Sequence, residues 1–298
     1  MDVPDLRGFV AVAEECHFSR AAERLHISQP PLSQRIARLE RKLGVPLFQR
    51  GRGGVRLTAA GQALLPQARA ILEQVARAEE LAQRAGRGES GRLSIGFAGS
   101  MPFSERLPRL LRDFRVCWPE VRLQLREQSS GEQIRQLLEH GLDVGFIRPT
   151  RHDAGQALET RVLEREPLFV ALHAEHPWAA LARLSLHRLR EQPFILYSVE
   201  FGSGLREHIL GMCLRAGFTP RVVQDVHEMP TLISLVSAGI GIGLVTASMQ
   251  RASVPNVRYV ALSDVEASSD IVLAWRRGDD SPVLRNFLGL ALAAAPST

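Results

Sequence analysis

Cysteine is scarce in this chain. Its 298 residues include only Cys16, Cys117 and Cys213, an odd number at wide separations. This pattern excludes the disulfide framework that stabilises small secreted domains, and it brings no two thiols together for a redox switch. We therefore expect three buried structural thiols within helices, in a protein of the cytoplasm.

The sequence predicts neither a membrane-spanning segment nor a leader. No apolar run reaches the roughly 18 residues that a membrane span needs. The N-terminal stretch MDVPDLRGFVAVAEE has the pattern of an acidic amphipathic helix and not that of a signal peptide. We therefore expect no membrane partner.

Signatures of catalysis and of metal binding are also absent. The sequence has no Ser-His-acid order, paired carboxylate motif or phosphate-binding loop, so we expect no enzyme and no cofactor. His173 and His176 have a metal-like spacing, but no third ligand lies near them in the sequence, which favours surface histidines. Gly239, Gly241 and Gly243 precede a predicted strand instead of following one, which favours close packing over nucleotide binding.

Positive charge is concentrated at the N-terminal end. The net charge is +5, and only Lys42 among the 37 cations is lysine. Residues 1–57 contain ten Lys and Arg against six acids, whereas residues 58–90 contain four of each. A local basic excess of this kind is the electrostatic footprint of a nucleic-acid-binding segment.

Residues 18–57 predict two short helices, a tight turn and a basic hairpin. We expect the first helix to begin with Ser19 as its N-cap and the second to begin after Ser28. Pro30 and Pro31 then fall in the first turn of the second helix, where missing amide donors cost nothing. The glycine-rich segment 50–54 predicts a flexible basic tip that resembles a wing.

The second predicted helix is apolar on one side and polar on the other. Leu32, Ile36, Leu39 and Leu43 recur at helical spacing and predict a buried stripe. The opposite face carries Gln, Ser and Arg, which suits the second helix of a helix-turn-helix spanning about Phe18 to Ala37.

This interpretation assigns DNA contacts to individual side chains. We expect base-edge contacts in the major groove from Gln29, Pro30, Pro31, Ser33 and Gln34, further contacts from Ser28 and Arg35, a phosphate contact from Arg38, and contacts to the flanking minor groove or backbone from Arg50 and Arg52.

Residues 59–87 predict one long helix capped by Thr58. Its apolar residues alternate at spacings of three and four, and Pro66 is expected to bend or loosen it locally. Because this helix has no core of its own in the sequence pattern, we expect its apolar stripe to pack on a second copy. The prediction is a homodimer, assembling further to a homotetramer through the C-terminal domain.

From residue 92 onward, predicted strands alternate with predicted helices. We expect strands at 92–97, 121–127, 143–148, 167–173, 194–197, 221–226, 242–245, 257–262 and 270–275, and helices at 104–116, 131–140, 204–216, 228–239 and 282–294. The alternation implies parallel sheets with crossover helices. We expect two lobes, one formed by about 92–163 and 268–298 and the other by about 167–262.

The segments FSRAAERLHISQPPLSQRIARLE, KLGVPLFQR and VRLTAAG, in this order near the N-terminus, closely resemble the DNA-binding domain of LysR-type transcriptional regulators. The resemblance implies an N-terminal all-α winged helix-turn-helix at 1–58 and a linker helix at 59–87 that makes an antiparallel dimer contact. It also implies an α/β two-lobed, periplasmic-binding-protein-like effector domain at 92–298. An ordinary three-helix bundle with solvated arginines is the alternative for the N-terminal segment.

Ligands of such two-lobed folds sit in a cleft at the carboxyl ends of the strands. Three predicted loops should meet there, at 98–104, 128–131 and 198–204, and Ser hydroxyls with backbone amides at helix starts bind carboxylates well. The alternative is that these serines are only helix caps. The candidate effector-binding residues are Ser100, Met101, Pro102, Ser129, Ser130, Arg148, Phe201, Gly202 and Ser203.

Arg148 ends a predicted strand and is a candidate charge partner for an anionic effector. A salt bridge to a nearby acid is the alternative. The pieces IGFAGSMPF, GFIRP and FILY and the paired serines resemble LysR-type regulators of aromatic-compound catabolism, which sense benzoate-like or muconate-like acids. The loop at 198–204 departs from that subgroup.

Two hypotheses about function follow. The first is a sequence-specific regulator of transcription that binds double-stranded promoter DNA and is modulated by a small anionic effector, aromatic or dicarboxylic, between its two lobes. RNA polymerase is a further expected partner. The alternative is a small-molecule binding module or sensor whose basic N-terminus serves a partner other than DNA.

Overall fold

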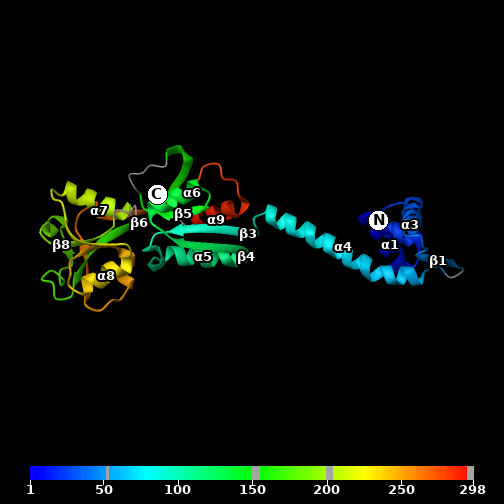
Figure 1. Cartoon of the computed structure of the whole chain (residues 1–298), viewed down its shortest axis with the longest axis horizontal. Coiled ribbons are helices and arrows are strands. Elements are labelled where there is room, and N and C mark those ends of the chain that lie inside the picture. Colours follow the sequence, from blue (N-terminus) through cyan, green and yellow to red (C-terminus); the bar gives the residue numbers. More distant parts are fainter. Residues whose placement is uncertain (52–53, 150–154, 199–203, 294–298) are drawn as a thin grey trace. The chain divides into compact units, whose positions relative to one another are not determined.

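The computed structural model describes residues 1–51, 54–149, 155–198 and 204–293. The chain forms two compact units, Met1–Arg84 and Ala85–Thr298. Figure 1 labels the main helices and strands of both. The first unit is a small helical domain continued by a long helix, and the second is an α/β domain with two lobes.

Three helices and a hairpin form the N-terminal domain. They are α1 (Val3–Glu15), α2 (Phe18–Arg24), α3 (Gln29–Leu43), β1 (Phe48–Gly51) and β2 (Gly54–Leu57). α1 begins with a capping box in which Asp2 and Asp5 each accept the other's backbone N–H. The prediction of Ser19 as the cap of α2 is wrong. Because Phe18 enters the core as the first helical residue, the cap is His17, whose Nδ1 accepts from Ser19 N.

α3 packs its apolar stripe into the core of this domain. Leu32, Ile36 and Leu39 are buried there together with residues of α1 and α2. Leu43, predicted to continue the stripe, is 39% exposed. The helix ends at this residue, and Gly44 turns the chain away in the left-handed conformation at φ 73°.

α4 (Ala59–Gly86) is one continuous helix that runs through Pro66. Its predicted cap is confirmed, because Thr58 Oγ1 accepts a hydrogen bond from Gly61 N at 3.0 Å. No side chain larger than hydrogen fits at Gly61, since a Cβ there would lie 2.3 Å from Leu47 O. The start of α4 is therefore pressed against the N-terminal domain.

The first half of α4 has a partner within the chain. Ala68 is fully buried, and Leu64, Leu65 and Leu72 pack against the core of the N-terminal domain. The expectation that the whole apolar stripe lacks an intramolecular surface is therefore wrong for this half. From Ile71 onward, apolar side chains other than Leu72 remain exposed or half-buried, at Ile71, Val75, Ala78, Leu81 and Ala82.

Lobe I is built on a sheet with helices on both faces. It contains β3 (Ser90–Phe97), η1 (Met101–Phe103), α5 (Arg106–Cys117), β4 (Glu120–Glu127), α6 (Ser130–Leu138), β5 (Val144–Ile147) and α9 (Pro282–Ala293). β3 pairs in parallel with β4 and with β5. α5 and α9 pack on one face through Phe114 and Phe287, and α6 packs on the other through Leu137. Figure 1 shows α5 and α6 on opposite sides of these strands.

Lobe II has a comparable arrangement. Its elements are β7 (Arg183–Leu184), η3 (Leu186–Leu189), β8 (Pro193–Tyr197), α7 (Gly204–Arg215), β9 (Arg221–Val226), α8 (Met229–Ser237), β10 (Gly243–Thr246), η5 (Ala247–Arg251) and β11 (Val257–Leu262). β8 pairs in parallel with β9. The packing role predicted for Gly243 is confirmed, because a Cβ there would lie 2.3 Å from Leu232 Cδ2.

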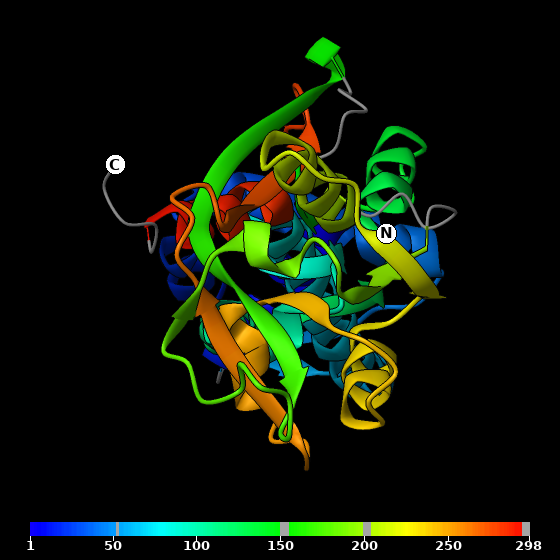
Figure 2. The same cartoon turned by 90° about the vertical axis from the view of Figure 1, so that its left-hand side faces the viewer.

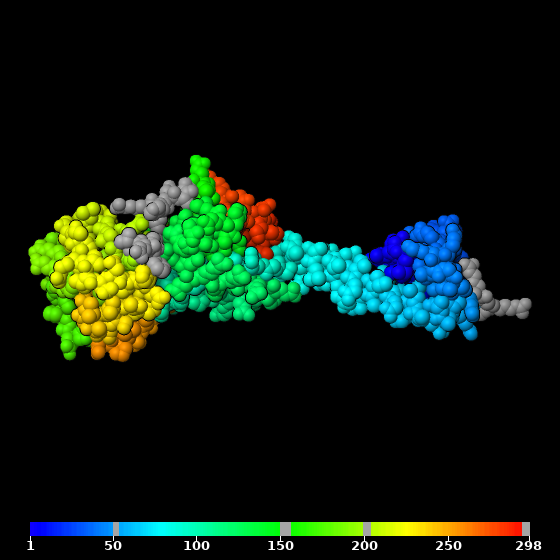
Figure 3. All heavy atoms as spheres, viewed as in Figure 1, coloured from blue at the N-terminus to red at the C-terminus, as the bar shows by residue number. Residues whose placement is uncertain are grey.

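Two long strands, β6 (Leu158–His173) and β12 (Ser268–Arg276), join the lobes. β6 pairs antiparallel with β12 through residues 158–167, and then with β10 and β11 through residues 168–173. Figure 2 shows β6 in green beside the orange strand β11, and in Figure 3 the green surface of lobe I adjoins the yellow surface of lobe II. The sequence predicted parallel sheets, but the sheet that contains β6 is mixed, with both parallel and antiparallel pairs.

The cysteines differ from expectation at two positions. Cys213 is buried, and burial raises the pKa of its thiol to about 12. Cys16 and Cys117 are exposed, because each lies at the end of a helix. Across the described ranges no helix is both long and apolar enough to cross a membrane. The same ranges contain no group of three His, Cys, Asp or Glu side chains placed to hold a metal ion.

Candidate nucleic-acid interface and effector cleft

The first turns of α3 present a polar surface to solvent. Ser28 adopts the extended N-cap conformation, but its side chain makes no capping hydrogen bond. Leu32 and Ile36 hold the other side of the helix in the core. The predicted base-reading residues lie on this surface, with Ser28, Gln29, Pro30, Pro31 and Gln34 exposed and Ser33 and Arg35 half-buried.

The turn between α2 and α3 is held at both ends. Ser19 Oγ lies 3.1 Å from Gln29 Oε1 and donates to it, which joins the start of α2 to the start of α3. Ile27 N donates to Ala22 O at 3.0 Å, while His26 takes the left-handed conformation at φ 52°. These contacts fix two helices and a tight turn in the predicted helix-turn-helix order.

Arg38 faces solvent, with 57% of its side chain exposed, but it is also ion-paired. Its Nη2 donates to Asp5 Oδ1 and lies 3.5 Å from Asp2 Oδ2, so both carboxylates of the α1 capping box contact it. The hydrogen bond to Asp5 raises the pKa of the Arg38 guanidinium. The guanidinium is thus ion-paired within the domain.

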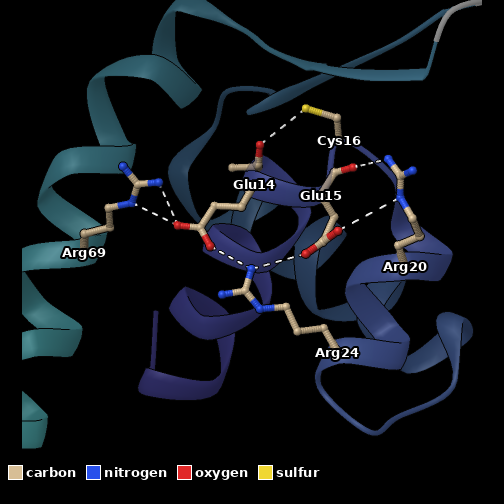
Figure 4. Close-up of polar contacts among 7 residues, drawn as sticks. Glu14, Glu15, Cys16, Arg20, Arg24 and Arg69 are labelled. Carbon is tan, nitrogen blue, oxygen red and sulfur yellow. Dashed lines mark hydrogen bonds and ion pairs between the residues drawn. The ribbon is translucent and has the colours of Figure 1, made fainter.

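A network of ion pairs joins α1 to α2 and to α4 (Figure 4). Glu14 accepts from Arg24 Nη1 and from Arg69 Nη2, each at 2.7 Å. Glu15 accepts a longer bond from Arg24 at 3.3 Å. Hydrogen bonds from Arg69 and Arg24 hold the pKa of Glu14 below its ordinary value. The first half of α4 is therefore bound to the helix-turn-helix by ion pairs as well as by packing.

The predicted wing is an antiparallel hairpin of β1 and β2. Arg50 lies opposite Val55 in the register, and Gly51 lies opposite Gly54. Val55 N donates to Cys16 O at 3.2 Å, which fastens the hairpin to the end of α1. The side chain of Arg50 and the whole of Arg52 lie outside the described residues.

A cavity of about 300 Å³ lies between the two lobes. Most of its lining follows the carboxyl ends of β3, β4, β5, β8 and β9, the edge at which ligands of such sheets bind. Its lining residues are Ala98, Gly99, Ser100, Glu127, Gln128, Ser129, Ser130, Arg148, Tyr197, Leu205, His227, Glu228 and Met229.

Arg148 is the most connected side chain of this cavity. It is 3% exposed, and its Nη2 donates to Ser100 Oγ at 3.1 Å and to Glu166 Oε2 at 2.6 Å. Its Nη1 lies 3.4 Å from Ser269 O, and its backbone N donates to Ser130 Oγ at 2.9 Å. Arg148 therefore lines the cavity and also makes the internal salt bridge considered as the alternative.

Glu166 is the buried counter-charge, at 4% exposure on β6. Burial by itself raises the pKa of Glu166. The Arg148 charge and the hydrogen bonds from Ser248 outweigh that effect, so the pKa lies below its ordinary value. The backbone N of Ser248 donates to Glu166 Oε1 at 2.6 Å. The carboxylate thus stays ionised and keeps Arg148 in place.

The three serines of the cavity share one property: each hydroxyl oxygen already accepts an N–H. Ser100 accepts from Arg148 Nη2, Ser130 from Arg148 N, and Ser129 from Glu132 N at 3.2 Å. Ser129 is thus also the helix cap of the alternative interpretation. Each hydroxyl keeps its own proton to donate, so the set favours a ligand that accepts hydrogen bonds.

Other predicted effector residues lie elsewhere. Met101 is 2% exposed and belongs to the core of lobe I, because the first turn of η1 points its side chain into the sheet. Pro102 is exposed and lines a different surface hollow of lobe I. Phe201, Gly202 and Ser203 lie outside the described residues.

Lobe II contributes residues that the sequence analysis missed. They are Tyr197 at the end of β8 and His227, Glu228 and Met229 after β9. The hydroxyl of Tyr197 donates to Met229 Sδ, and burial raises the pKa of Tyr197. These four residues could have been predicted from the sequence. Tyr197 ends the predicted strand FILY and the other three follow the predicted strand at 221–226, and ligands bind at such strand ends.

Comparisons with known proteins agree with this geometry. Residues 3–62 match the model of the bacterial regulatory helix-turn-helix protein, lysR family, and residues 86–296 match that of the LysR substrate binding domain. The HTH-type transcriptional regulator YnfL of Escherichia coli K12 is 42% identical over 288 residues, which is 96% of each chain.

Solved structures share the architecture. Full-length CbnR complexed with its target DNA has a TM-score of 0.83 and 30% identity and covers 99% of each chain. The BenM effector binding domain with its effector benzoate has a TM-score of 0.60 and 30% identity. The match covers 68% of this chain and 91% of that domain. The chain therefore belongs to the LysR family of DNA-binding transcriptional regulators and carries the family's effector-binding domain.

Proposed function

We propose that this regulator reads its operator through the first turns of α3. Gln29, Ser33 and Gln34 meet base edges in the major groove by hydrogen bonds, and Pro30 and Pro31 offer apolar contact to a thymine methyl. The exposure of this surface, on a helix whose other side is buried, supports the assignment.

Gln34→Ala tests this placement. Loss of a base contact should reduce discrimination between the operator and base-substituted operators by about 1–3 kcal/mol while leaving binding to unrelated DNA unchanged. Competition gel shifts on the promoter region upstream of the gene measure this ratio, with the exposed α4 variant Gln83→Ala as the control. Equal weakening on every sequence would assign Gln34 to the backbone instead.

We propose that the wing assists through Arg50 and Arg52, which reach the flanking minor groove or the backbone. The β1–β2 hairpin supplies the support, because it fixes both ends of the basic tip. Alanine at both positions should lower DNA affinity with an unchanged thermal transition. Loss of the transition would instead show that these arginines stabilise the fold.

We propose that the interlobe cavity binds a small carboxylic acid. The observation that carries this proposal is the convergence of three hydroxyl donors and the Arg148 guanidinium on one cavity of about 300 Å³. Tyr197, Leu205 and Met229 supply apolar surface for the rest of the ligand. The relative BenM, solved with its effector benzoate, supports an aromatic or dicarboxylic effector and a place in the aromatic-catabolism subgroup.

Titration calorimetry with benzoate and with muconate tests this site. Ser100→Ala and Arg148→Ala should weaken binding, and Ser100→Ala should leave effector-free DNA binding intact. Ser234→Ala, an exposed serine of α8 that does not line the cavity, is the control. Equal affinity in wild type, Ser100→Ala and Arg148→Ala would exclude the cavity as the sensor site.

We also propose a homodimer that forms through the exposed half of α4 and assembles to a homotetramer through the effector domains. Helix-turn-helix proteins commonly bind DNA as dimers, in which each subunit contacts one of two half-sites at a fixed spacing. In this proposal the regulator acts in the cytoplasm, where promoter DNA lies, and contacts RNA polymerase there.

A further inference from the structure

Three arginines follow one another along α3 at intervals of three residues, and they differ in their partners. Among the residues that the structure describes, Arg35 and Arg41 contact no carboxylate. Arg38, between them, contacts both Asp2 and Asp5. The difference comes from what α1 places beside the helix, because both carboxylates that contact Arg38 belong to the start of α1.

The carboxylates beside Arg38 are fixed in position. The side chain of Asp5 is 3% exposed, and the capping box binds it to Asp2. A buried carboxylate is costly without a partner, so Asp5 holds the nearby guanidinium. The α-amino group of Met1 is a second cation near Asp5, at the longer distance of 3.9 Å. Arg38 is therefore the main counter-charge of Asp5.

This pairing changes what Arg38 offers to DNA. The two carboxylates of Asp2 and Asp5 offset the charges of Arg38 and of the nearby α-amino group of Met1, and the side chain of Asp2 is 56% exposed beside that of Arg38. A phosphate that approached Arg38 would meet this carboxylate. A cation that is already neutralised also releases no DNA counterion, and counterion release drives the sequence-independent part of binding.

We propose that Asp5, together with Asp2, withholds Arg38 from the DNA backbone. Asp5 is then a positioning residue: it anchors α3 to α1 and lowers non-specific affinity, so that more of the binding depends on base contacts. This inference rests on the proposed DNA-facing position of α3. It replaces the phosphate contact expected for Arg38.

The salt dependence of binding tests this role, because a purely structural contact would not change it. Full-length protein is titrated onto a mixed-sequence duplex without an operator, between about 50 and 200 mM salt. The quantity measured is the slope of the logarithm of the binding constant against the logarithm of the salt concentration. Asp2→Asn with Asp5→Asn frees Arg38 and should steepen this slope by about 0.9 per subunit. Adding Arg38→Gln to these two changes should restore the wild-type slope.

Single variants of α3 provide the matched comparison. Arg38→Gln in the wild-type background should leave the slope unchanged, whereas Arg35→Gln should flatten it by about 0.9 per subunit. If Arg38→Gln unfolds, Asp5→Asn/Arg38→Gln removes both charges and should show the wild-type slope. The proposal would be overturned if Arg38→Gln, or this double variant, flattened the slope as much as Arg35→Gln does. Unchanged slopes in Arg35→Gln and Arg41→Gln would instead count against the DNA-facing position of α3.

Discussion

The ion pair of Arg148 and Glu166 is a buried charge pair at the centre of the effector domain. Both side chains are almost fully buried, and their partners include the Ser100 hydroxyl and the Ser248 backbone N–H. The pair thereby joins the end of β5 in lobe I, the crossing strand β6 and η5 of lobe II. Removing one member of such a pair leaves a buried charge without compensation.

Glu166→Gln should therefore destabilise the effector domain by about 3–5 kcal/mol. Urea denaturation of the full chain measures the change in the free energy of unfolding. Glu164→Gln, two residues away on the same strand and half-buried, is the matched control and should have a small effect. Equal losses in the two variants would contradict a special role for the Arg148 pair.

The same carboxylate predicts a dependence on pH. The pKa of Glu166 is lowered on folding, so its contribution to stability is present above the unfolded pKa of about 4.3 and is lost as pH falls through the folded value. In thermal melts below about pH 4.3, the stability difference between wild type and Glu166→Gln should shrink. A difference that stays constant down to pH 3 or so would show that Glu166 is not the titrating group.

These residues show how far the sequence determines the site. Strand-end placement predicted Ser100, Ser129, Ser130 and Arg148, and the structure brings all four to one cavity. Glu166 was not predictable, because it lies in the charged stretch LETRVLERE, which carries no clear strand pattern. Its burial arises from the pairing of β6 with β12, a contact between segments about a hundred residues apart that no local pattern encodes.

At the scale of elements, α4 has two different halves. Ala68 and Leu72 pack on the N-terminal domain. Ile71 and Ala78, which are exposed, and Val75, which is half-buried, continue down one side at spacings of four and three. Helical periodicity predicted the helix and its cap correctly. It did not distinguish the two halves, because the same apolar periodicity continues from the part that packs on the N-terminal core into the part that is exposed.

Ile71→Asp with Val75→Asp should dissociate the proposed dimer, since carboxylates on both helices would face each other in an apolar seam. Neither side chain belongs to the N-terminal core, so that domain should keep its thermal transition. Ala76→Asp with Gln83→Asp adds the same charge at exposed positions of α4 outside the line of Ile71, Val75 and Ala78, and is the control. Light scattering that finds the same mass in both double variants would remove α4 as the dimer surface.

At the scale of the whole molecule, the chain that links the two units runs from α4 into lobe I, and we expect an effector to influence DNA binding along it. Asn286 of α9 donates from Nδ2 to Arg87 O at 2.9 Å and to Gly88 O at 3.3 Å. Gly88 has a φ of 70°, and a Cβ there would lie 2.5 Å from Pro282 C. The residues after α4 are thus held tightly against α9. We therefore expect a rearrangement of lobe I that moves α9 to be passed on to the residues that follow α4.

Asn286→Ala should therefore weaken the coupling between the two ligands without changing the affinity for either one alone. Effector and operator must change each other's affinity by the same factor, typically about 5–150-fold, because binding is linked. The effector Kd measured with and without operator DNA gives this factor, and it should fall toward one in Asn286→Ala. Arg285→Ala, which removes a neighbouring side chain that bonds only the Asp280 carbonyl in the described structure, should keep the wild-type factor. Full coupling in Asn286→Ala would show that the signal reaches DNA by a route other than α9.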